Sequence, residues 1–198
     1  MSLKSLFFLV ILNFISPILK AEALKSVESL ELKSYLGLWH EYLRLPNQFE
    51  DKEGKFCFDV TAEYYLMSDE SLSVKNTCHF LEGKNLTKED VAIGRAVIAD
   101  TSSNARLKVE FIPIPILRDI VRWVSEPNYI VIGLGEKNSN GQYSWSVVGS
   151  PDRKYAWVLS RKPVLAKEDI ELTRQILEKQ GFDYEKMIRP IQPKPTYK

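Results

Sequence analysis

The sequence predicts an all-β protein of eight short antiparallel strands, followed by one helix near the C-terminus. Three observations predict this class. Apolar and polar residues alternate with period two from Gly37 to Arg161, turn-forming residues separate these segments at regular intervals, and helical periodicity begins only after Pro163. Periodicity alone leaves open whether the eight strands close into one barrel or form a sandwich of two sheets.

Residues 1–23 have the pattern of a secretory leader. Lys4 precedes an apolar run over residues 6–12, and small residues follow at Ala21 and Ala23. Pro17 lies soon after the run, which is short for a membrane-spanning helix of about 20 apolar residues. We expect cleavage after Ala23 and export to a periplasm or out of the cell. No cysteine lies near this site, so we expect a soluble protein without a lipid-modified cysteine.

The remaining chain, residues 24–198, has the length of one domain, and no linker divides it. It is nearly neutral: the whole sequence has 27 basic and 26 acidic residues, a net charge of +1, and no basic block. Nucleic-acid binding requires a concentrated positive charge. This class of function is therefore excluded.

The strands are expected in segments separated by turn residues such as Asn138-Ser139-Asn140-Gly141, near residues 37–46, 58–67, 71–80, 91–100, 105–112, 128–135, 142–149 and 154–161. One face of several segments is bulkier and must be buried, as with Leu107, Val109 and Phe111. A helix is expected over residues 167–180, before Gly181. The proline-rich tail over residues 190–198 is expected to be mobile.

A known family becomes apparent in the first strand. Residues 35–50, Y-L-G-L-W-H-E-Y-L-R-L-P-N-Q-F-E, resemble the opening of lipocalins of the bacterial and apolipoprotein D group, whose pattern is Y-L-G-x-W-Y-E-x-x-R-x-P-x-x-F-E. His40 replaces the usual tyrosine. Further matches follow in order along the chain, through Val74-Lys75-Asn76 and Leu107-Lys108-Val109-Glu110-Phe111 to Tyr155-Ala156-Trp157-Val158-Leu159-Ser160-Arg161.

The resemblance implies an eight-stranded up-and-down β-barrel over about residues 37–161, closed at one end and open at the other, with the helix outside. It also implies that Trp39 and Arg161 form a cation–π pair at the closed end, where Gly37 has a structural role. The implied function is to carry one small apolar molecule, such as a fatty acid or lysophospholipid. Neither catalysis nor a cofactor or metal is expected.

If Trp39 points inward, alternation predicts the residues that line the interior: Glu41, Leu43, Ala62, Tyr64, Val74, Asn76, Val109, Phe111, Tyr129, Val131, Trp145, Val147 and Trp157. An apolar lining with a few polar groups suits an amphiphile. The alternative is a core filled by these side chains. Small residues such as Ala62, Gly94 and Ala96 would leave voids in a filled core, and because voids are costly they favour a ligand pocket instead. A carboxylate at Glu41 would be costly on an apolar wall unless paired, so the alternative to a role in ligand binding is an internal ion pair, for which Arg161 is a candidate partner.

Cys57 and Cys78 are the chain's two cysteines, and export makes a disulfide the ordinary expectation. However, the expected register places them on opposite faces of an unbroken ladder. A disulfide therefore requires a bulge, or a strand that begins after Cys57. Two free thiols remain the alternative.

Three further possibilities concern function. Neither His40 nor His79 points inward in the expected register, and no nucleophile motif is present, which disfavours an enzyme. An isomerase that uses Cys78 inside the barrel, or an interaction module that acts through its loops, remains an alternative.

An amphipathic segment over residues 115–126 places Leu117, Val121 and Trp123 on one side. This side is expected to act as a lid or to make a transient contact with a membrane surface.

Overall fold

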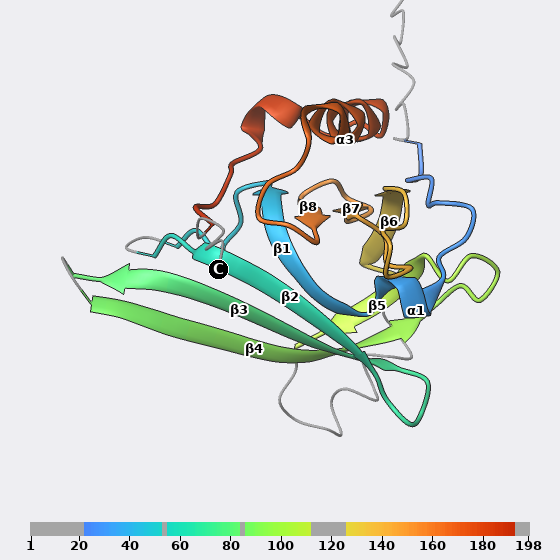
Figure 1. Ribbon diagram of the computed structural model, residues 1–198, viewed down its shortest axis with the longest axis horizontal. Coiled ribbons are helices and arrows are strands. Elements are labelled where there is room, and N and C mark those ends of the chain that lie inside the picture. The colour runs from blue at the N-terminus through green and yellow to red at the C-terminus, as the bar shows by residue number, and fades with distance from the viewer. Residues whose placement is uncertain (1–21, 53–54, 84–85, 112–125, 193–198) are drawn as a thin grey trace, which may run out of the picture.

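The computed structural model describes residues 22–52, 55–83, 86–111 and 126–192 (Figure 1). Eight antiparallel strands form a closed barrel in which each strand pairs with its neighbours in the chain. The strands are β1 (Gly37–Arg44), β2 (Phe58–Leu66), β3 (Leu72–Glu82), β4 (Leu86–Ile98), β5 (Arg106–Glu110), β6 (Tyr129–Leu134), β7 (Trp145–Gly149) and β8 (Ala156–Ser160). The barrel closes where β8 pairs with β1. This confirms the predicted fold and decides between barrel and sandwich.

The largest difference from the predicted strands is in β4, which begins at Leu86 rather than near residue 91. Residues 86–96 of β4 pair with β3 without interruption, from Leu86 opposite Glu82 to Ala96 opposite Leu72. Residues 86–93 are exposed, and Lys88, Glu89 and Asp90 among them are charged. Because neither face there is buried, the sequence has no apolar alternation to indicate a strand.

In the described residues, three helices accompany the barrel: α1 (Leu32–Tyr35), α3 (Lys167–Lys179) and η1 (Tyr184–Lys186). The first turn of α3 contains Glu168 and Asp169, whose negative charges stabilise the helix by interacting with the positive end of its dipole. The chain leaves α3 through Gly181, whose φ of +82° suits glycine. α3 packs on the outside of the barrel against β6 and β7 (Figure 1). In the described ranges, none of the helices has the length and apolar character needed to cross a membrane.

Two apolar clusters lie on opposite sides of the barrel wall. The inner cluster includes Trp39, Tyr64, Val74, Val131 and Leu159. The outer cluster joins the wall to α3 and to the residues after it, and its members include Tyr42, Leu43, Trp145, Val147, Val158, Leu177 and Phe182. As a result β7 is buried on both faces along its whole length.

The C-terminal segment, residues 188–192, lies between β1 and β2 where these strands separate. Arg44 exchanges backbone hydrogen bonds with Ile188, at 2.8 and 3.0 Å. Gln192 Nε2 donates to the backbone oxygens of Glu41 and Val60, at 2.8 and 3.0 Å. Part of the tail expected to be mobile, residues 190–192, thus supplies partners to main-chain groups of β1 and β2.

Some predictions concern residues outside the described ranges. This group contains residues 1–21 of the expected leader, the segment with Leu117, Val121 and Trp123, and residues 193–198. These predictions stay predictions.

Candidate functional site

One end of the barrel, here called the Trp39 end, is held by Arg161. Its guanidinium lies 3.6 Å from the ring centre of Trp39. The same group donates hydrogen bonds to backbone oxygens of Ser34, Tyr35, Leu36 and Leu38, at 2.6 to 3.1 Å. Burial lowers the pKa of Arg161 to about 10, which leaves it charged at neutral pH. The expected cation–π contact is thus present, and main-chain oxygens replace a carboxylate partner.

Next to this end, three tyrosines form a neutral polar floor inside the barrel. The hydroxyl of Tyr129 lies 2.7 Å from that of Tyr35 and 2.8 Å from that of Tyr64. Tyr35 also reaches Ser146 Oγ at 3.3 Å. Burial raises the pKa of all three tyrosines, so they remain protonated and exchange hydrogen bonds among themselves.

The wall above the floor is apolar but incompletely covered. Ala62, Val74 and Val131 belong to the buried inner cluster. In contrast, Val109, Tyr129 and Trp157 are only partly buried. Phe111, the residue after β5, is 43% exposed although continued alternation from Val109 would place it on the inner side. A core filled by protein would bury such aromatic side chains. Solvent therefore reaches the inner face at this level.

Asn76 and Gly94 refine this description of the wall. Asn76 pairs in register with Ala62, and its side-chain oxygen is buried without a hydrogen-bond partner among the described residues. A Cβ at Gly94 would lie 2.7 Å from the ring of Phe111. The sequence suggested that Gly94 leaves free space for a pocket. In the structure the ring of Phe111 occupies that space.

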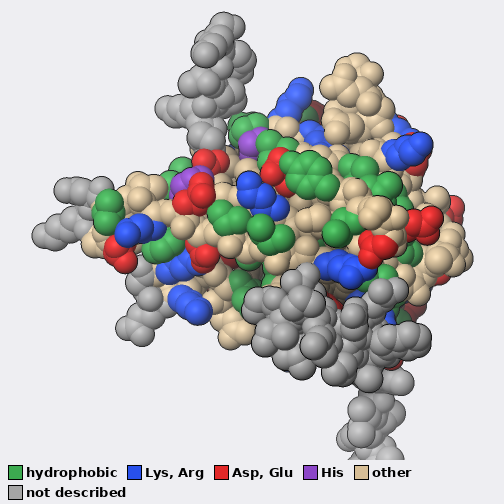
Figure 2. Space-filling model, turned by 90° about the horizontal axis from the view of Figure 1, so that it is seen from below, with side chains coloured by type: hydrophobic (Ala, Val, Ile, Leu, Met, Phe, Trp, Pro, Cys, Tyr) green, Lys and Arg blue, Asp and Glu red, His purple; other side chains and the backbone are tan. Residues whose placement is uncertain are grey.

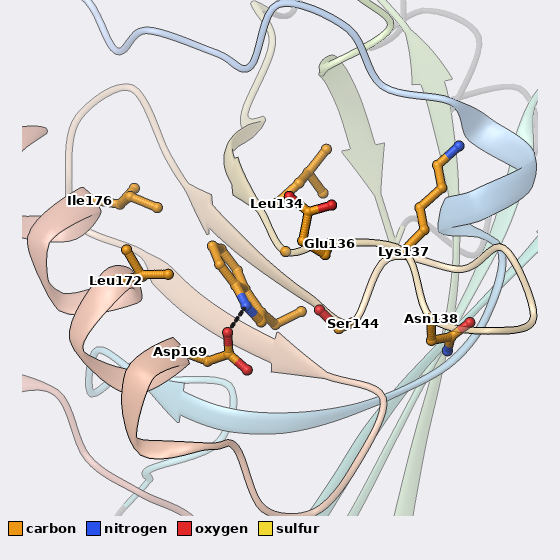
Figure 3. A pocket seen from close by; sticks show the side chains of 10 residues that line it. Leu134, Glu136, Lys137, Asn138, Ser144, Asp169, Leu172 and Ile176 are labelled. Atoms are coloured by element: carbon orange, nitrogen blue, oxygen red, sulfur yellow. Dashed lines mark hydrogen bonds between the residues drawn. The ribbon is translucent and has the colours of Figure 1, made fainter.

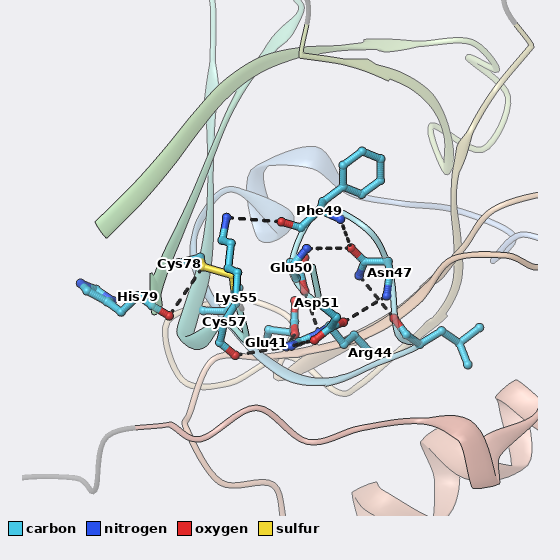
Figure 4. A network of polar contacts seen from close by, with 12 residues as sticks. Glu41, Arg44, Asn47, Phe49, Glu50, Asp51, Lys55, Cys57, Cys78 and His79 are labelled. Atoms are coloured by element: carbon cyan, nitrogen blue, oxygen red, sulfur yellow. Dashed lines mark hydrogen bonds and ion pairs between the residues drawn. A yellow bond between two sulfur atoms is a disulfide. The ribbon is translucent and has the colours of Figure 1, made fainter. Parts of the chain in front are cut away.

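The opposite end, here called the Arg44 end, has a buried charge network (Figure 4). Arg44 is 0% exposed. Its nitrogens lie 2.8 Å from Glu41 Oε1, 3.0 Å from Glu50 Oε2 and 2.5 Å from Asp51 Oδ1. Glu50 and Asp51 come from the β1–β2 loop, residues 45–57. One cation on β1 thus binds the loop through two carboxyl groups.

A β-bulge makes this network possible. Glu41 and Arg44 are three positions apart, so in a regular strand they would face opposite sides of the sheet. The register of β1 against β8 shifts between Glu41 and Leu43, where Glu41 pairs with Leu159 and Leu43 pairs with Val158. The expectation that Glu41 pairs with Arg161 is therefore wrong, because the bulge places Arg44 beside it.

The network shifts the pKa of each member. Burial and the nearby charge of Glu50 raise the pKa of Glu41 well above its ordinary value, and burial also raises that of Glu50. For Asp51, burial opposes ionisation, but hydrogen bonds from Arg44 and the Asn47 amide outweigh it and lower the pKa. Burial disfavours the charge on Arg44 too, yet its acidic partners raise its pKa. Glu41 and Glu50 are therefore the members most ready to hold a proton.

A disulfide anchors the far end of the loop. Cys57 and Cys78 are bonded, with their Cα atoms 5.4 Å apart. Cys57 precedes β2, and the β2–β3 register shifts between Phe58 and Thr61, which removes the parity conflict seen in the sequence. The Cys57 amide donates to the Glu50 backbone oxygen at 3.0 Å. Because both cysteines are bonded, Cys78 offers no thiol to the isomerase alternative.

Three residues predicted to line the interior lie outside it. Leu43, Trp145 and Val147 belong to the outer cluster. For Leu43 the cause is the bulge in β1. For Trp145 and Val147 it is the register of β7, since Ser146 pairs with Leu159 of the inner cluster and Val148 with Trp157. Side-chain size cannot identify the inner face of a strand when a helix covers its outer face, because both faces are then buried.

Trp145 lines an outer groove of about 500 Å³ between the β6–β7 connection and α3 (Figure 3). Its ring nitrogen donates to Asp169 Oδ1 on α3 at 2.8 Å. Leu172 and Ile176 of α3 face the same groove. Trp145 therefore attaches the helix to the barrel.

Metal-ligating and catalytic groups are scarce in the part of the chain that the structure describes, where no three His, Cys, Asp or Glu side chains are grouped as metal ligands. His79 lies between Asp59 and Glu89, 3.5 Å from each. The molecular face in Figure 2 shows acidic, basic and hydrophobic side chains interspersed rather than gathered by type. This agrees with the balanced composition.

Comparison with known proteins gives a consistent result. A family model for a lipocalin-like domain matches residues 30–192. The outer membrane lipoprotein Blc of Vibrio cholerae is 32% identical over 167 residues, covering 84% of this chain and 85% of its own. Apolipoprotein D of Mus musculus is 29% identical over 160 residues, covering 81% and 76%. The solved structure of the cockroach allergen Per a 4 matches with a TM-score of 0.59 at 13% identity, covering 88% of this chain and 94% of the allergen, a likeness of fold alone.

Proposed function

The chain belongs to the lipocalin family, and on that premise we propose that it binds and transports or stores one small hydrophobic molecule inside its barrel. A single observation carries the proposal: inward-facing residues of the barrel wall, above all Phe111 and Trp157, are only partly covered by other side chains. Apolar surface left open to water inside a barrel gains free energy when a ligand covers it.

The ligand class that suits this lining is a single-chain amphiphile, a fatty acid or a lysophospholipid. The apolar wall, with Val74, Val109 and Val131, suits an acyl chain. The unpartnered Asn76 oxygen and the tyrosine floor offer hydrogen bonds to a polar group. Trp157 and Tyr129 are the residues we propose for direct contact.

We propose a carrier rather than an enzyme. Both cysteines are used in the disulfide, and His79 is held between two carboxylates of neighbouring strands. We also propose that residues 1–23 direct export, as the sequence predicts, to a compartment in which this disulfide persists.

The test is native mass spectrometry of the purified protein, followed by organic extraction and identification of what is released. We expect one bound molecule per chain. If the native protein is empty, titration with a fatty acid and a lysophospholipid follows, with Trp157→Ala as the weakened variant. A protein that retains nothing and binds neither class would exclude the carrier function and favour an interaction module.

A further inference from the structure

Glu41 and Glu50 form a carboxyl pair between the barrel wall and a loop. Glu41 belongs to β1 and Glu50 to the β1–β2 loop (Figure 4). Each has an oxygen within 3.0 Å of the Arg44 guanidinium, so the two carboxyl groups share one cation. Two ionised carboxylates held at the same buried cation repel each other, and a proton on one of them removes this repulsion.

Charge balance also favours this proton. Arg44 faces three carboxyl groups, so full ionisation would leave two negative charges in excess. Asp51 ionises readily because hydrogen bonds stabilise its charge. The side chains of Glu41 and Glu50 are only 4% and 15% exposed, so water does little to separate their charges.

Among the described residues, few other charged groups face this pair. Arg44 faces the pair from β1, and Asp51 faces it from the loop. The C-terminal segment contributes the neutral amide of Gln192, bonded to the Glu41 backbone, while β2 and β3 contribute the disulfide. On β8, Trp157 pairs with Arg44 and carries no charge. The loop's Lys55 is engaged with Asp90 of β4.

The loop that Glu50 holds is coupled to the proposed ligand site. Phe49, next to Glu50, packs on Tyr155 with ring centres 5.6 Å apart. Tyr155 stacks on Trp157 at 5.9 Å. Any movement of Glu50 away from Glu41 therefore disturbs a row of aromatic rings that ends at the inner wall.

We propose that Glu41 and Glu50 form a proton-operated latch, which holds residues 45–52 of the β1–β2 loop against the barrel while the pair shares a proton and releases them when that proton leaves. The proton passes to solvent, and the two carboxylates then repel each other across the loop contact. The consequence for the ligand, faster exchange at the Arg44 end, rests on the proposed function. The closed form binds the proton more tightly than the open form, so the loop is held at low pH and loosens as pH rises above the ordinary glutamate range.

The first experiment needs no ligand. The glutamate carboxyl carbons of the full chain are labelled with carbon-13 and followed by NMR from acidic to mildly alkaline pH, together with amide hydrogen exchange in residues 45–57. We expect one titration above the ordinary glutamate range, accompanied by faster loop exchange than the chemical effect of pH explains. Glu50→Gln and Glu41→Gln should each abolish the titration and hold the loop at every pH, because an amide carries no charge and cannot repel the remaining carboxylate. Glu168→Gln, an exposed substitution on α3, should change neither result.

The second experiment measures release of N-phenylnaphthylamine, a probe that stays uncharged across this pH range. We expect its dissociation rate to rise about tenfold across the titration in the parent protein and to stay flat in Glu50→Gln. Ordinary glutamate titration, or a loop equally mobile at all pH values, overturns the latch whether or not the probe binds. A normal latch in a protein that binds no probe or lipid would instead contradict the proposed function. If the pair titrates as expected but the dissociation rate of the probe stays constant, the proposed link between the latch and ligand exchange is overturned.

Discussion

The two ends of the barrel each bury an arginine, but they hold it in opposite ways. At the Trp39 end, Arg161 stacks on an indole and donates to main-chain oxygens. At the Arg44 end, Arg44 is bound by carboxyl groups from its own strand and from a loop. Main-chain oxygens do not titrate in water, whereas carboxyl groups do. The first end is therefore fixed at every ordinary pH, and the second responds to protons.

This difference matches the elements that each arginine joins. Arg161 binds the short helix α1 and the start of β1, which cover one end of the barrel next to the tyrosine floor. Arg44 binds a loop whose aromatic contacts lead to Trp157. A permanent seal at one end and a releasable contact at the other allow a ligand to exchange without unfolding the barrel.

The largest expected effect comes from Trp39→Ala at the fixed end. Trp39 is fully buried and carries both the inner cluster and the Arg161 contact. We expect a loss of about 3 to 5 kcal/mol in the free energy of unfolding, measured by chemical denaturation. The loss should be the same at acidic and neutral pH. A strong pH dependence would show that the Trp39 end is not the inert one.

Arg44→Met should cost about 3 kcal/mol at neutral pH, because it leaves buried carboxylates without their cation. Without Arg44, the pKa values of Glu41 and Glu50 rise further, so both groups become neutral as pH falls. Protonation favours the folded form of such groups, and the difference from the parent protein should shrink towards acidic pH. Denaturation curves that stay parallel across pH would contradict this contrast between the two ends.

Removal of the disulfide tests the anchor of the loop. In Cys57→Ser with Cys78→Ser, the loss of a cross-link between residues 21 positions apart should lower the stability by about 3 kcal/mol. We also expect faster amide exchange in residues 45–57 than in residues 30–40 at the other end. Equal acceleration at both ends would mean that the disulfide stabilises the whole barrel rather than the Arg44 end.

The smallest expected effect comes from comparing two tryptophans on opposite faces of the barrel wall, Trp157 and Trp145. Trp157→Ala should weaken binding of a fluorescent fatty acid about tenfold, roughly 1.4 kcal/mol, with the barrel still folded. Trp145→Ala is the matched control, since its indole lies outside and bonds to Asp169. It should destabilise the packing of α3 and leave the affinity unchanged. The reverse ranking would place the ligand on the outer face.

The strands and the outer helix could be predicted from the sequence because each has a strong local signal. Period-two alternation ends at turn residues, and helix α3 begins and ends within one residue of its predicted bounds. The seal at the Trp39 end was also predictable, because the resemblance supplied Trp39 and Arg161 as a pair.

The Arg44 end could not be predicted, because its arrangement depends on bulges. Alternation assumes an unbroken ladder, and a shift between Glu41 and Leu43 reverses the faces of every later residue in β1. The presence of two charged residues in an otherwise apolar strand was the one available signal. The inner and outer faces of β7 could not be told apart from the sequence either, because α3 covers the outer face and the strand is buried on both sides.

The most direct test of the carrier function uses a stearic acid that bears a nitroxide on its chain. Bound in the barrel, the nitroxide should broaden the NMR signals of inward residues such as Val109, Phe111 and Trp157, and leave those of Leu172 and Ile176 at the outer groove sharp. The signals should recover when unlabelled stearic acid competes. Broadening centred on Leu172 and Ile176, or no specific broadening, would contradict a ligand site inside the barrel.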